Sequence, residues 1–510
     1  MTSGPEGPAL RLTARWVAGA MGAALVAGDP SQEFHGVSID TRTLAAGDLF
    51  IAIRGERFDG AEFAEAAIGK GAAGVVVPRS WSATLRPFEG LRVAPSNVEG
   101  RQAQGRPEQS RGAKASAERG AQASAGRVVL EVDDPTLALQ ALGHAVRRES
   151  GTKVVAITGS AGKTTTKEVT AELLAARYRV VRNRGNLNNH IGLPLSLVEL
   201  RQRPEIAVVE LGMNHPGEIS TLVRVAEPDV RVWTNVGEAH LGFFASLDAI
   251  ADAKAEIFEA ASPDAVLVAN ADDDRIVSRL PSFAGRVVSF GIDRQADVRA
   301  SDIVDRGIDG TSARVTTVRG SVELATPLVG RGNLANILAA TAVAEEFGIG
   351  LETIAELAAT LRPAAHRGEI VRLRSGITII DDSYNANPTA TRRAIDVLTR
   401  SASGGRRIAV LGEMLELGDR ASQLHAEVGR AAAAAKVDVL LAVGGAPAAA
   451  LAAAAVAAGL SKDAVQHFAT SVEAAEAAVA TTKAGDLVLV KGSRGVRTDL
   501  VVDRLKAERG

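Results

Sequence analysis

Short apolar runs recur along this chain, and stretches with helical spacing separate them. Four of these runs lie at 153–159, 206–211, 230–234 and 265–269, and the intervals between them are long enough for helices. Parallel strands need long crossovers, usually helices, and strands buried on both faces are almost continuously apolar. We therefore predict an α/β fold in which helices cover both faces of a parallel sheet.

The same alternation restarts beyond Leu361. Its apolar runs lie at 377–381, 407–412, 437–444 and 486–492. The Ala-rich stretch 446–458 is interpreted as a helix and not as low-complexity sequence, because Ala is the strongest helix former and permits close packing on a sheet. The C-terminal part is therefore expected to form a second, Rossmann-like α/β domain.

One segment cannot contribute to a core. From 96 to 127 the composition is dominated by Gln, Arg, Gly, Ser and Ala, and Val98 is the only sizeable aliphatic residue. Such a segment cannot bury enough apolar surface to offset the entropy lost on ordering. We expect 96–127 to be a disordered insertion between a strand at 74–78 and a strand at 127–132.

Chain length indicates the number of domains. At 510 residues the chain is about three domains long, if roughly 150 residues are taken per domain. The alternation of strands and helices divides it into a first α/β domain at 1–150, a central domain with a parallel sheet at 151–361, and a C-terminal domain at 362–510.

The composition excludes several classes of protein. Hydrophobic residues make up 46% of the chain, so a mainly disordered protein is excluded. The formal net charge of -2 provides no global field that favours nucleic acid or an anionic membrane. The chain has 0 Cys, which excludes disulfides and thiolate sites, and its first residues lack the apolar core of a signal peptide. We expect a soluble cytoplasmic protein that neither enters a membrane nor binds nucleic acid.

The stretch AITGSAGKTTTKE combines a buried strand, a Gly-rich turn and the start of a helix. Gly159 and Gly162 allow backbone N–H groups to face a polyphosphate, and the N-terminus of the helix adds partial positive charge. Lys163 is expected to reach the outer phosphates, and Thr164 to ligate magnesium. The general phosphate-loop pattern is matched incompletely, because Ile157 stands at its first Gly position, and a purely structural turn is the alternative.

Polar side chains follow two further predicted strands. Glu210 comes near the end of the run 206–211, and His240 follows the run 230–234, at the edge where parallel sheets carry their functional groups. Taken alone, the carboxylate could cap a helix and the imidazole could be structural. Their position downstream of the GKT turn favours a catalytic role for both. Lys254 lies on a predicted helix, where a solvated charge is the alternative reading.

The form TGSxGKTT of the Gly-rich turn resembles the ATP loop of the Mur ligase and folylpolyglutamate synthase superfamily. Three further blocks make the resemblance closest to the MurF type of the Mur ligase family: DDSYNANP at 381–388, LGEMLELG at 411–418 with His425 following, and VKGSRG at 490–495. The block SIDTRTLAAGDLFIAIRGERFDG at 38–60 is similar to the uridine-nucleotide-binding domain of the later Mur ligases. Together these blocks span nearly the whole chain outside the polar insertion.

This resemblance implies a site for ATP and magnesium. One Mg²⁺ would be held by Thr164 and Glu210, and a second by His240 and Lys254, a lysine that is often carbamylated in this superfamily. The catalytic residues would be Lys163, His240 and Lys254. ATP would be bound by the turn and by three residues of later blocks: Gly159, Ser160, Ala161, Gly162, Lys163, Thr164, Thr165, Asn336, Arg367 and Asp382.

The resemblance also implies the reaction. ATP would convert the terminal carboxylate of a UDP-N-acetylmuramoyl tripeptide into an acyl phosphate, which the amine of D-alanyl-D-alanine would attack, releasing phosphate. This is a step of peptidoglycan precursor synthesis, and we expect the enzyme to be a monomer. Amides and cations suit carboxylates and peptide groups. The candidates for holding the nucleotide sugar are Thr41 and Arg42, and those for the peptides are Asn188, Tyr384, Asn385, Lys491 and Arg494.

Two departures from the family pattern and three alternatives stay open. Gly332 and Ala61 stand where the family usually has His. A sister ligase that adds a single amino acid would share the ATP loop, but would not be expected to combine DDSYNANP with GEMLELG. A folylpolyglutamate synthase would lack the block at 38–60. A catalytically silent nucleotide-binding scaffold is disfavoured by the presence of Lys163 and Glu210 in one chain with His240 and Lys254.

Overall fold

The computed structural model describes residues 7–55, 58–79, 81, 127–239 and 241–510. These residues form two compact units. The first contains the residues up to Thr152 together with His190–Arg203, and the second contains Lys153–Asn189 and Pro204–Gly510. The insertion expected at 96–127 lies outside the described residues, apart from Arg127.

The first unit is built on a sheet of five described strands. Strand β2 pairs with β7 in antiparallel fashion, and the other neighbours are parallel. The two strands predicted at 74–78 and 127–132 are confirmed as β6 and β7. In spatial order the strands are β2 (Ala24–Ala27), β7 (Val128–Val132), β6 (Gly74–Pro78), β5 (Leu49–Ile51) and β4 (Val37–Ser38). Strands β1 (Leu12–Thr13) and β3 (Glu33–Phe34) form a separate pair.

The longest described helix of this unit is α4 (Pro135–Ser150). It begins where the Asp134 carboxylate accepts the N–H groups of Thr136 and Leu137, with Pro135 in the first turn. Helix α6 (Gly192–Val198) packs against α4 so closely that a Cβ on Gly143 would lie 3.0 Å from Pro194 Cα. This contact explains why 190–203 belongs to the first unit. Helices α1 (Ala14–Met21) and α2 (Ala64–Gly69) complete it.

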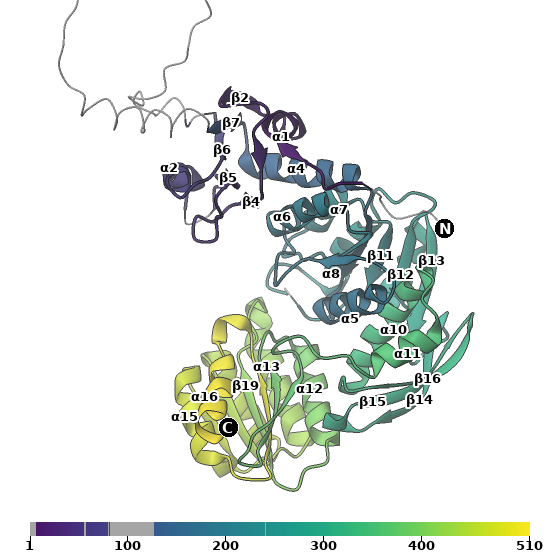
Figure 1. The fold of residues 1–510 in the computed structure, drawn as a ribbon. Coiled ribbons are helices and arrows are strands. Elements are labelled where there is room, and N and C mark those ends of the chain that lie inside the picture. Colours follow the sequence, from purple (N-terminus) through teal and green to yellow (C-terminus); the bar gives the residue numbers. More distant parts are fainter. Residues whose placement is uncertain (1–6, 56–57, 80, 82–126, 240) are drawn as a thin grey trace, which may run out of the picture. The chain divides into compact units, whose positions relative to one another are not determined.

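The second unit contains two sheets, and the first of these has nine described strands (Figure 1). Neighbouring strands from β9 to β14 are parallel, which confirms the predicted type of sheet. In spatial order the strands are β16 (Gly320–Thr326), β15 (Thr311–Thr317), β14 (Val298–Asp305), β13 (Arg286–Gly291), β12 (Val266–Asn270), β11 (Val230–Trp233), β8 (Lys153–Thr158), β10 (Ile206–Glu210) and β9 (Val180–Arg182).

One end of this sheet differs from the prediction. Strands β14, β15 and β16 are antiparallel neighbours. Buried and more exposed side chains alternate along β15, as is typical of a sheet with one solvated face. These strands have no continuous apolar run, so the sequence pattern did not predict them.

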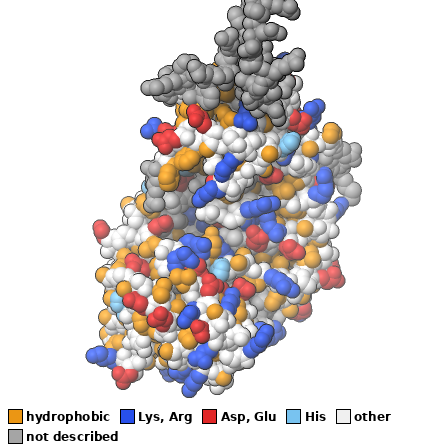
Figure 2. All heavy atoms as spheres, turned by 60° about the vertical axis from the view of Figure 1, so that its left-hand side comes forward, with side chains coloured by type: hydrophobic (Ala, Val, Ile, Leu, Met, Phe, Trp, Pro, Cys, Tyr) orange, Lys and Arg blue, Asp and Glu red, His pale blue; other side chains and the backbone are white. Residues whose placement is uncertain are grey.

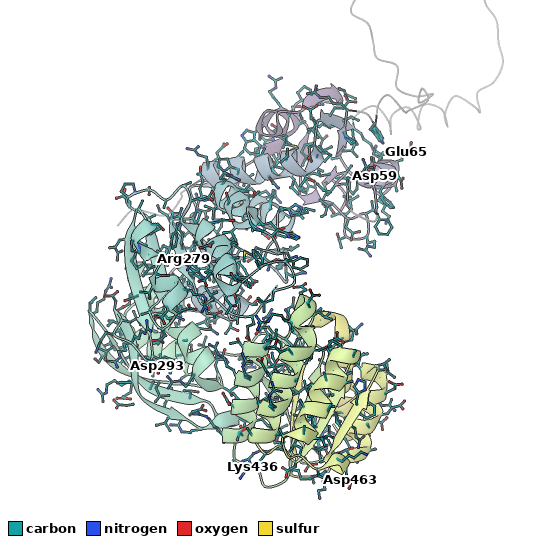
Figure 3. All side chains as sticks on the ribbon, turned by 180° about the vertical axis from the view of Figure 1, so that it is seen from behind. Asp59, Glu65, Arg279, Asp293, Lys436 and Asp463 are labelled. Atoms are coloured by element: carbon teal, nitrogen blue, oxygen red, sulfur yellow. The ribbon has the colours of Figure 1, made fainter. Side chains whose placement is uncertain are left out.

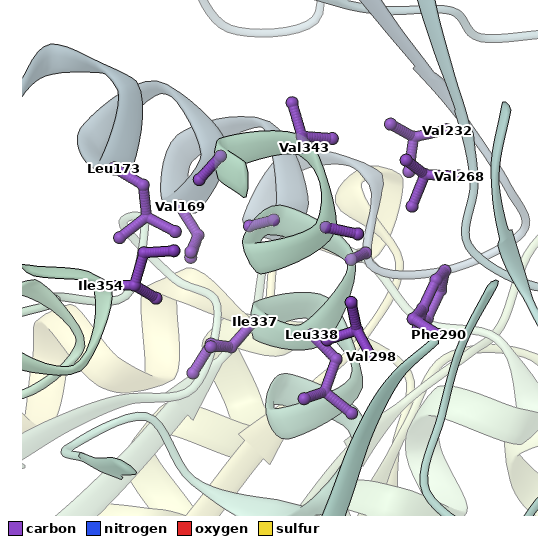
Figure 4. Close-up of a cluster of buried hydrophobic side chains, with 14 of the residues drawn as sticks. Val169, Leu173, Val232, Val268, Phe290, Val298, Ile337, Leu338, Val343 and Ile354 are labelled. Atoms are coloured by element: carbon purple, nitrogen blue, oxygen red, sulfur yellow. The ribbon is translucent and has the colours of Figure 1, made fainter. Parts of the chain in front are cut away.

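The core of this sheet forms around helix α10 (Gly330–Glu346). Figure 4 shows Leu338 of α10 beside Val298 of the sheet, and Val169 and Leu173 of α5 (Lys163–Ala175) near Ile354 of α11 (Leu351–Ala358). All of these side chains are buried, and burying a side chain of this size contributes about 1.5–3 kcal/mol. Helices α7 (Glu218–Ala226), α8 (Leu247–Ala255) and α9 (Asp274–Val277) belong to the same region.

The second sheet of this unit has six described strands, all parallel to their neighbours except β17. The four predicted C-terminal strands are confirmed, as is the Ala-rich helix. In spatial order the strands are β17 (Glu369–Arg372), β18 (Thr378–Asp382), β22 (Leu487–Lys491), β19 (Arg407–Gly412), β20 (Val439–Val443) and β21 (Val465–Phe468). The helices are α12 (Pro388–Arg400), α13 (Ala421–Ala434), α14 (Ala446–Ala457), α15 (Ser471–Thr481) and α16 (Asp499–Arg509).

On the face shown in Figure 2, basic and acidic side chains are interspersed, in keeping with the net charge of -2. In the part of the chain that the structure describes, no helix is both long enough and apolar enough to span a bilayer.

His425 holds the segment after β19 in place. Its Nε2 accepts the N–H of Met414 at 2.8 Å, and its Nδ1 lies 2.7 Å from the carbonyl of Ala421. This pattern requires the neutral imidazole with a proton on Nδ1. Burial lowers the pKa of His425, against the weaker opposing effects of Ala421 and Glu413.

A pH dependence of stability follows. The unfolded chain binds a proton at His425 near the ordinary pKa of about 6.5, whereas the folded chain binds it only at lower pH. The contribution of His425 to the free energy of unfolding is therefore complete above about pH 6.5, and it is lost as the pH falls toward the lower pKa of the folded chain. Urea titrations at pH 7.5 and 5.5 should show a larger loss of stability for wild type than for His425→Gln, which keeps both hydrogen bonds but cannot titrate. Equal losses would contradict this.

Candidate active site

Three neighbouring parallel strands, β11, β8 and β10, end at the same edge of the central sheet. Glu210, the last residue of β10, is opposite Ile157 of β8, and Trp233 of β11 is opposite Thr158. The segments that follow these strands therefore begin side by side. They carry the Gly-rich turn, the block around Glu210 and the block NVGEAHLGFF.

The Gly-rich turn at 159–162 joins β8 to α5 and requires glycine at two positions. Gly159 has a φ of +150° and Gly162 a φ of +81°, which side-chain-bearing residues rarely adopt. A Cβ on Gly159 would lie 1.9 Å from Thr234 Oγ1, and one on Gly162 would lie 2.3 Å from Asn336 Oδ1. The turn is thus confined between the end of β11 and helix α10.

Asn235 holds this turn through both ends of its side-chain amide. Its Oδ1 accepts the N–H of Ala161 at 2.9 Å, and its Nδ2 donates to the carbonyl of Ala161 at 2.9 Å. The carbonyl of Asn235 accepts the N–H of Ser160 at 3.0 Å. The N–H groups of Ser160 and Ala161 are therefore already used by Asn235. The N–H groups in the first turn of α5, which include those of Thr164 and Thr165, have no partner within the helix and could bind an anion.

Asn235 was not assigned a role from the sequence. It begins the block NVGEAHLGFF, which also contains His240, and it follows strand β11 and Thr234 directly. A polar residue immediately after a buried parallel strand was the signal that pointed to Glu210, and the same signal could have found Asn235.

Glu210 is the centre of the charged cluster. It is 4% exposed, and its carboxylate accepts the hydroxyl of Thr164 at 2.7 Å and the amide of Asn188 at 2.8 Å. Burial alone would raise the pKa of Glu210, but Lys163, these two hydrogen bonds and Arg367 together hold that pKa below its ordinary value. Glu210 is therefore an anion throughout the neutral pH range.

Lys163 bends back onto its own loop, where its Nζ donates to the carbonyl of Gly159 at 2.8 Å. Burial lowers the pKa of Lys163, and the cation of Arg367 lowers it further, while the anion of Glu210 opposes both. The Nζ of Lys163 thus lies against the Gly-rich turn.

A second set of residues fixes the backbone around Glu210. The Oδ1 of Asn183 accepts the N–H of Glu210 at 3.0 Å, and its Nδ2 donates to the carbonyl of Leu187 at 2.8 Å. Lys167, which is 1% exposed, donates to the carbonyl of Asn183 at 2.7 Å. Neither residue was proposed from the sequence, because only the fold shows that β9 and α5 bring them to this strand.

Lys254 lies on helix α8 and is 1% exposed, so it is not the solvated charge of the alternative reading. Arg279, labelled in Figure 3, anchors this helix by donating to Asp252 at 2.6 Å. The pKa of Lys254 is well below its ordinary value because of burial and the nearby Lys163, with Glu210 opposing. The surroundings of Lys254 therefore favour its neutral form more than water does.

The predicted metal ligand His240 lies outside the described residues. Among the residues that are described, no group of three or more His, Cys, Asp or Glu side chains is arranged to hold a metal ion. The hydroxyl of Thr164 and the carboxylate of Glu210 nevertheless form a pair of hard oxygen donors, which suits magnesium.

Asn336 lies where the turn meets helix α10. The hydroxyl of Thr166 donates to its Oδ1 at 3.3 Å, and its side chain is 7% exposed. Gly332 is one helical turn earlier, and a Cβ there would lie 3.6 Å from the side chain of Arg393. A cation from α12 therefore approaches the position at which the family usually has His.

The C-terminal candidates form two groups of three residues. Arg367 stacks on the ring of Tyr384, with its Cζ 4.1 Å from the centroid, and Arg494 is 5.7 Å from the same centroid. Lys491, which is 3% exposed, donates to Asp382 at 2.6 Å and to the carbonyl of Asn385 at 2.9 Å. The structure thus brings together Lys491 and Asp382, which had been assigned to peptide and to ATP respectively.

His366 supports this group and was missed from the sequence. It has a φ of +60°, which is uncommon for a residue with a side chain, and its Nδ1 lies 2.9 Å from the fully buried carboxylate of Asp381. Its carbonyl accepts the N–H of Tyr384 at 3.1 Å. This pairing fixes the neighbouring Arg367 relative to the ring on which it stacks.

The candidates for the nucleotide sugar lie in the first unit. Asp40 holds Arg42 through bonds of 2.9 Å and 2.6 Å, and Arg42 in turn lowers the pKa of Asp40 to about 2. The carbonyl of Thr41 accepts Lys70 Nζ at 2.8 Å. Asp59 caps the short turn that contains Ala61, because its carboxylate accepts the N–H of Ala61 at 3.0 Å.

Family models and relatives agree with this geometry. The Mur ligase family catalytic domain matches residues 33–180, the Mur ligase middle domain matches 157–344, and the Mur ligase glutamate ligase domain matches 366–494. The UDP-N-acetylmuramoyl-tripeptide–D-alanyl-D-alanine ligase of Bacillus subtilis is 35% identical over 472 residues, which are 92% of this chain and 93% of that protein. The chain belongs to the Mur ligase family.

Solved structures show that this Mur ligase shares its fold with other members. MurF from Acinetobacter baumannii is 30% identical, with a TM-score of 0.82 over 98% of this chain and 100% of that one. MurF ligase from Thermotoga maritima, in complex with ADP, is 27% identical, with a TM-score of 0.74 over 93% of this chain and 97% of that one. The fold class predicted from the sequence, with its three α/β domains, is thereby confirmed.

The cluster predicts the effect of removing Lys163. Lys163→Ala should lower nucleotide-dependent phosphate release at least about 100-fold, because the charge directed at the transferred phosphate is lost. Lys153→Ala is the matched control, since this surface lysine begins β8, at the opposite end of the strand from the turn, and pairs with Asp229. Both variants should keep the circular dichroism spectrum of wild type. Near-normal release by Lys163→Ala would contradict the assignment of the turn.

Proposed function

We propose that this Mur ligase joins D-alanyl-D-alanine to a UDP-N-acetylmuramoyl tripeptide at the expense of ATP, as a step of peptidoglycan precursor synthesis. The observation that carries the proposal is the cluster of Lys163, Thr164 and Glu210 at the ends of β8 and β10. Over most of its length the chain is also similar to the UDP-N-acetylmuramoyl-tripeptide–D-alanyl-D-alanine ligase of Bacillus subtilis. ATP would bind at the turn. The related MurF ligase from Thermotoga maritima was solved in complex with ADP, which supports nucleotide binding.

The chain's own residues would act on the two steps as follows. N–H groups at the start of α5 and the ammonium of Lys163 would hold the terminal phosphate while the tripeptide carboxylate attacks its phosphorus and ADP leaves. The amine of the dipeptide would then attack the acyl carbon, lose a proton and expel phosphate. Arg367, held on Tyr384, would add positive charge at the phosphates, and Asn336 and Asp382 would contact the nucleoside.

Magnesium would be held by Thr164 and Glu210, and a second ion by His240 and modified Lys254. When bound, the ions would offset the repulsion between the anionic carboxylate and the anionic phosphate. The oxygen donors of Thr164 and Glu210 fit such an ion, and the hydrogen bond between them holds both donors at one place.

Carbamylation of Lys254 has a physical basis in its burial. A neutral amine can attack the carbon of CO₂, forming an N–C bond and releasing one proton, which converts the side chain into an anion. Burial lowers the pKa of Lys254 and so favours the neutral amine that this reaction needs. The product would be a carboxylate-like oxygen donor within the same cluster as Glu210.

The remaining residue assignments are also proposals. Asn188, Tyr384, Asn385, Lys491 and Arg494 would orient the peptide substrates, and Thr41 with Arg42 would lie near the nucleotide sugar. The three domains would be those at 1–150, 151–361 and 362–510. We further propose that the enzyme acts in the cytoplasm as a monomer.

Phosphate release under systematic omission tests the function. Purified protein should release phosphate from ATP only when magnesium, the UDP-N-acetylmuramoyl tripeptide and D-alanyl-D-alanine are all present. Replacing the dipeptide with single amino acids separates this function from that of a sister ligase. Release that ignores the dipeptide would contradict the proposal, and a complete lack of release would favour the silent scaffold.

Carbamylation has its own test. Wild-type protein equilibrated with ¹³C-labelled bicarbonate should show one protected carbamate signal by NMR, and Lys254→Ala should lack it. Lys153→Ala should keep the signal, because that lysine is on the surface. A wild-type spectrum without the signal, at a pH where the protein is active, would refute the modification.

A further inference from the structure

The loop that follows β11 contacts the Gly-rich turn through Gly237. The N–H of Gly237 donates to Ser160 Oγ at 2.9 Å, and the same hydroxyl donates to the carbonyl of Gly237 at 3.2 Å. A Cβ on Gly237 would lie 3.6 Å from Ser160 Cβ and 3.5 Å from Thr389 Oγ1. Gly237 is thus packed between the turn and helix α12.

The next residue, Glu238, is bound by helix α12. Its Oε2 accepts Arg392 Nη2 at 2.6 Å and Thr389 Oγ1 at 3.3 Å. The two donors are three residues apart and therefore lie on one face of the helix. The Glu238 side chain is 17% exposed, so the pair is partly desolvated and stronger than an ordinary surface ion pair.

The far end of the same loop is also held by the C-terminal region. The N–H of Gly242 donates to the carbonyl of Glu416 at 2.8 Å. A Cβ on Gly418 would lie 2.9 Å from Gly242 Cα, so the two backbones are in close contact. The loop is therefore bound on one side to the Gly-rich turn and on the other to helix α12 and to the segment after β19.

We propose that Glu238 is a positioning residue that couples the docking of helix α12 to the shape of the phosphate-binding turn. When Arg392 and Thr389 hold its carboxylate, the adjacent Gly237 keeps the hydroxyl of Ser160 in place, and Asn235 keeps Ala161 in place. Without that contact the loop can shift, and the turn loses its support from β11. This role rests on the ATP-dependent reaction proposed above, but the contact itself would affect only the binding of the nucleotide.

The first test is a double-mutant cycle with MgADP as the probe. Glu238→Gln and Arg392→Gln should each raise the Kd for MgADP about three- to thirty-fold by calorimetry. The double variant should be no weaker than the weaker single variant, because both changes break one contact. Glu427→Gln is the matched control: it removes the other carboxylate near Arg392, at 3.8 Å, and should bind MgADP as wild type does.

The second readout reports the docking itself. The chain has 0 Cys, so Val304→Cys and Val472→Cys, at side chains that are 51% and 57% exposed, allow a dye to be placed on each side of the contact. Single-molecule energy transfer should show one main population in wild type and in Glu427→Gln. Glu238→Gln and Arg392→Gln should add a second population, although their thermal midpoints stay near that of wild type.

Two results would overturn the role of Glu238. One is a Glu238→Gln variant with the Kd and the energy-transfer distribution of wild type. The other is full additivity of the two substitutions, which would mean that they act on separate contacts. Neither measurement needs a peptide substrate. A failed ligase assay with intact MgADP binding would therefore refute the proposed function, while the Kd for MgADP and the energy-transfer distribution would still decide the role of Glu238.

Discussion

The buried carboxylate of Glu210 is the constraint around which this catalytic edge is built. A charge at that depth is costly unless hydrogen bonds and opposite charges compensate it. Thr164, Asn188 and Lys163 provide that compensation, and they come from α5 and from the segment after β9. The strands β8 and β10 must therefore lie side by side in one register for Glu210 to be tolerated at all.

The same cluster sets the state of its lysines. Lys163 and Lys254 share one anion and little water, so the pKa values of both are lowered, with burial as the largest cause. Lys163 begins α5 and Lys254 lies on α8, so the two lysines reach the cluster from different elements.

Close packing around the Gly-rich turn has a comparable effect on shape. Thr234 and Asn336 approach Gly159 and Gly162 to distances that exclude a side chain, and Asn235 uses two N–H groups of the turn for structure. The anion-binding capacity is thereby concentrated at the start of α5. Because Asn235, Gly237 and Glu238 are close in sequence, the contacts that shape the turn and those that reach α12 belong to one short loop.

Local pattern alone was enough for the buried parallel strands, the Gly-rich turn and the carboxylate at the end of β10, because each of these depends on near neighbours in the sequence. The antiparallel strands β15 and β16 were not predicted, since their alternating pattern is a weaker signal than a continuous apolar run. Residues such as Asn183, Lys167 and His366 carry no local signal. Their roles arise from partners that are distant in the sequence or from an unusual backbone angle.

By itself, then, the sequence determined the fold class, the family and the residue types of the nucleotide site. Only the tertiary structure decided which of these residues share a hydrogen bond, that Lys254 is buried, and that Lys491 is paired with Asp382. The physical reason is that strand order and burial, neither of which is a local property of the chain, set the distances and the loss of solvent on which those energies depend.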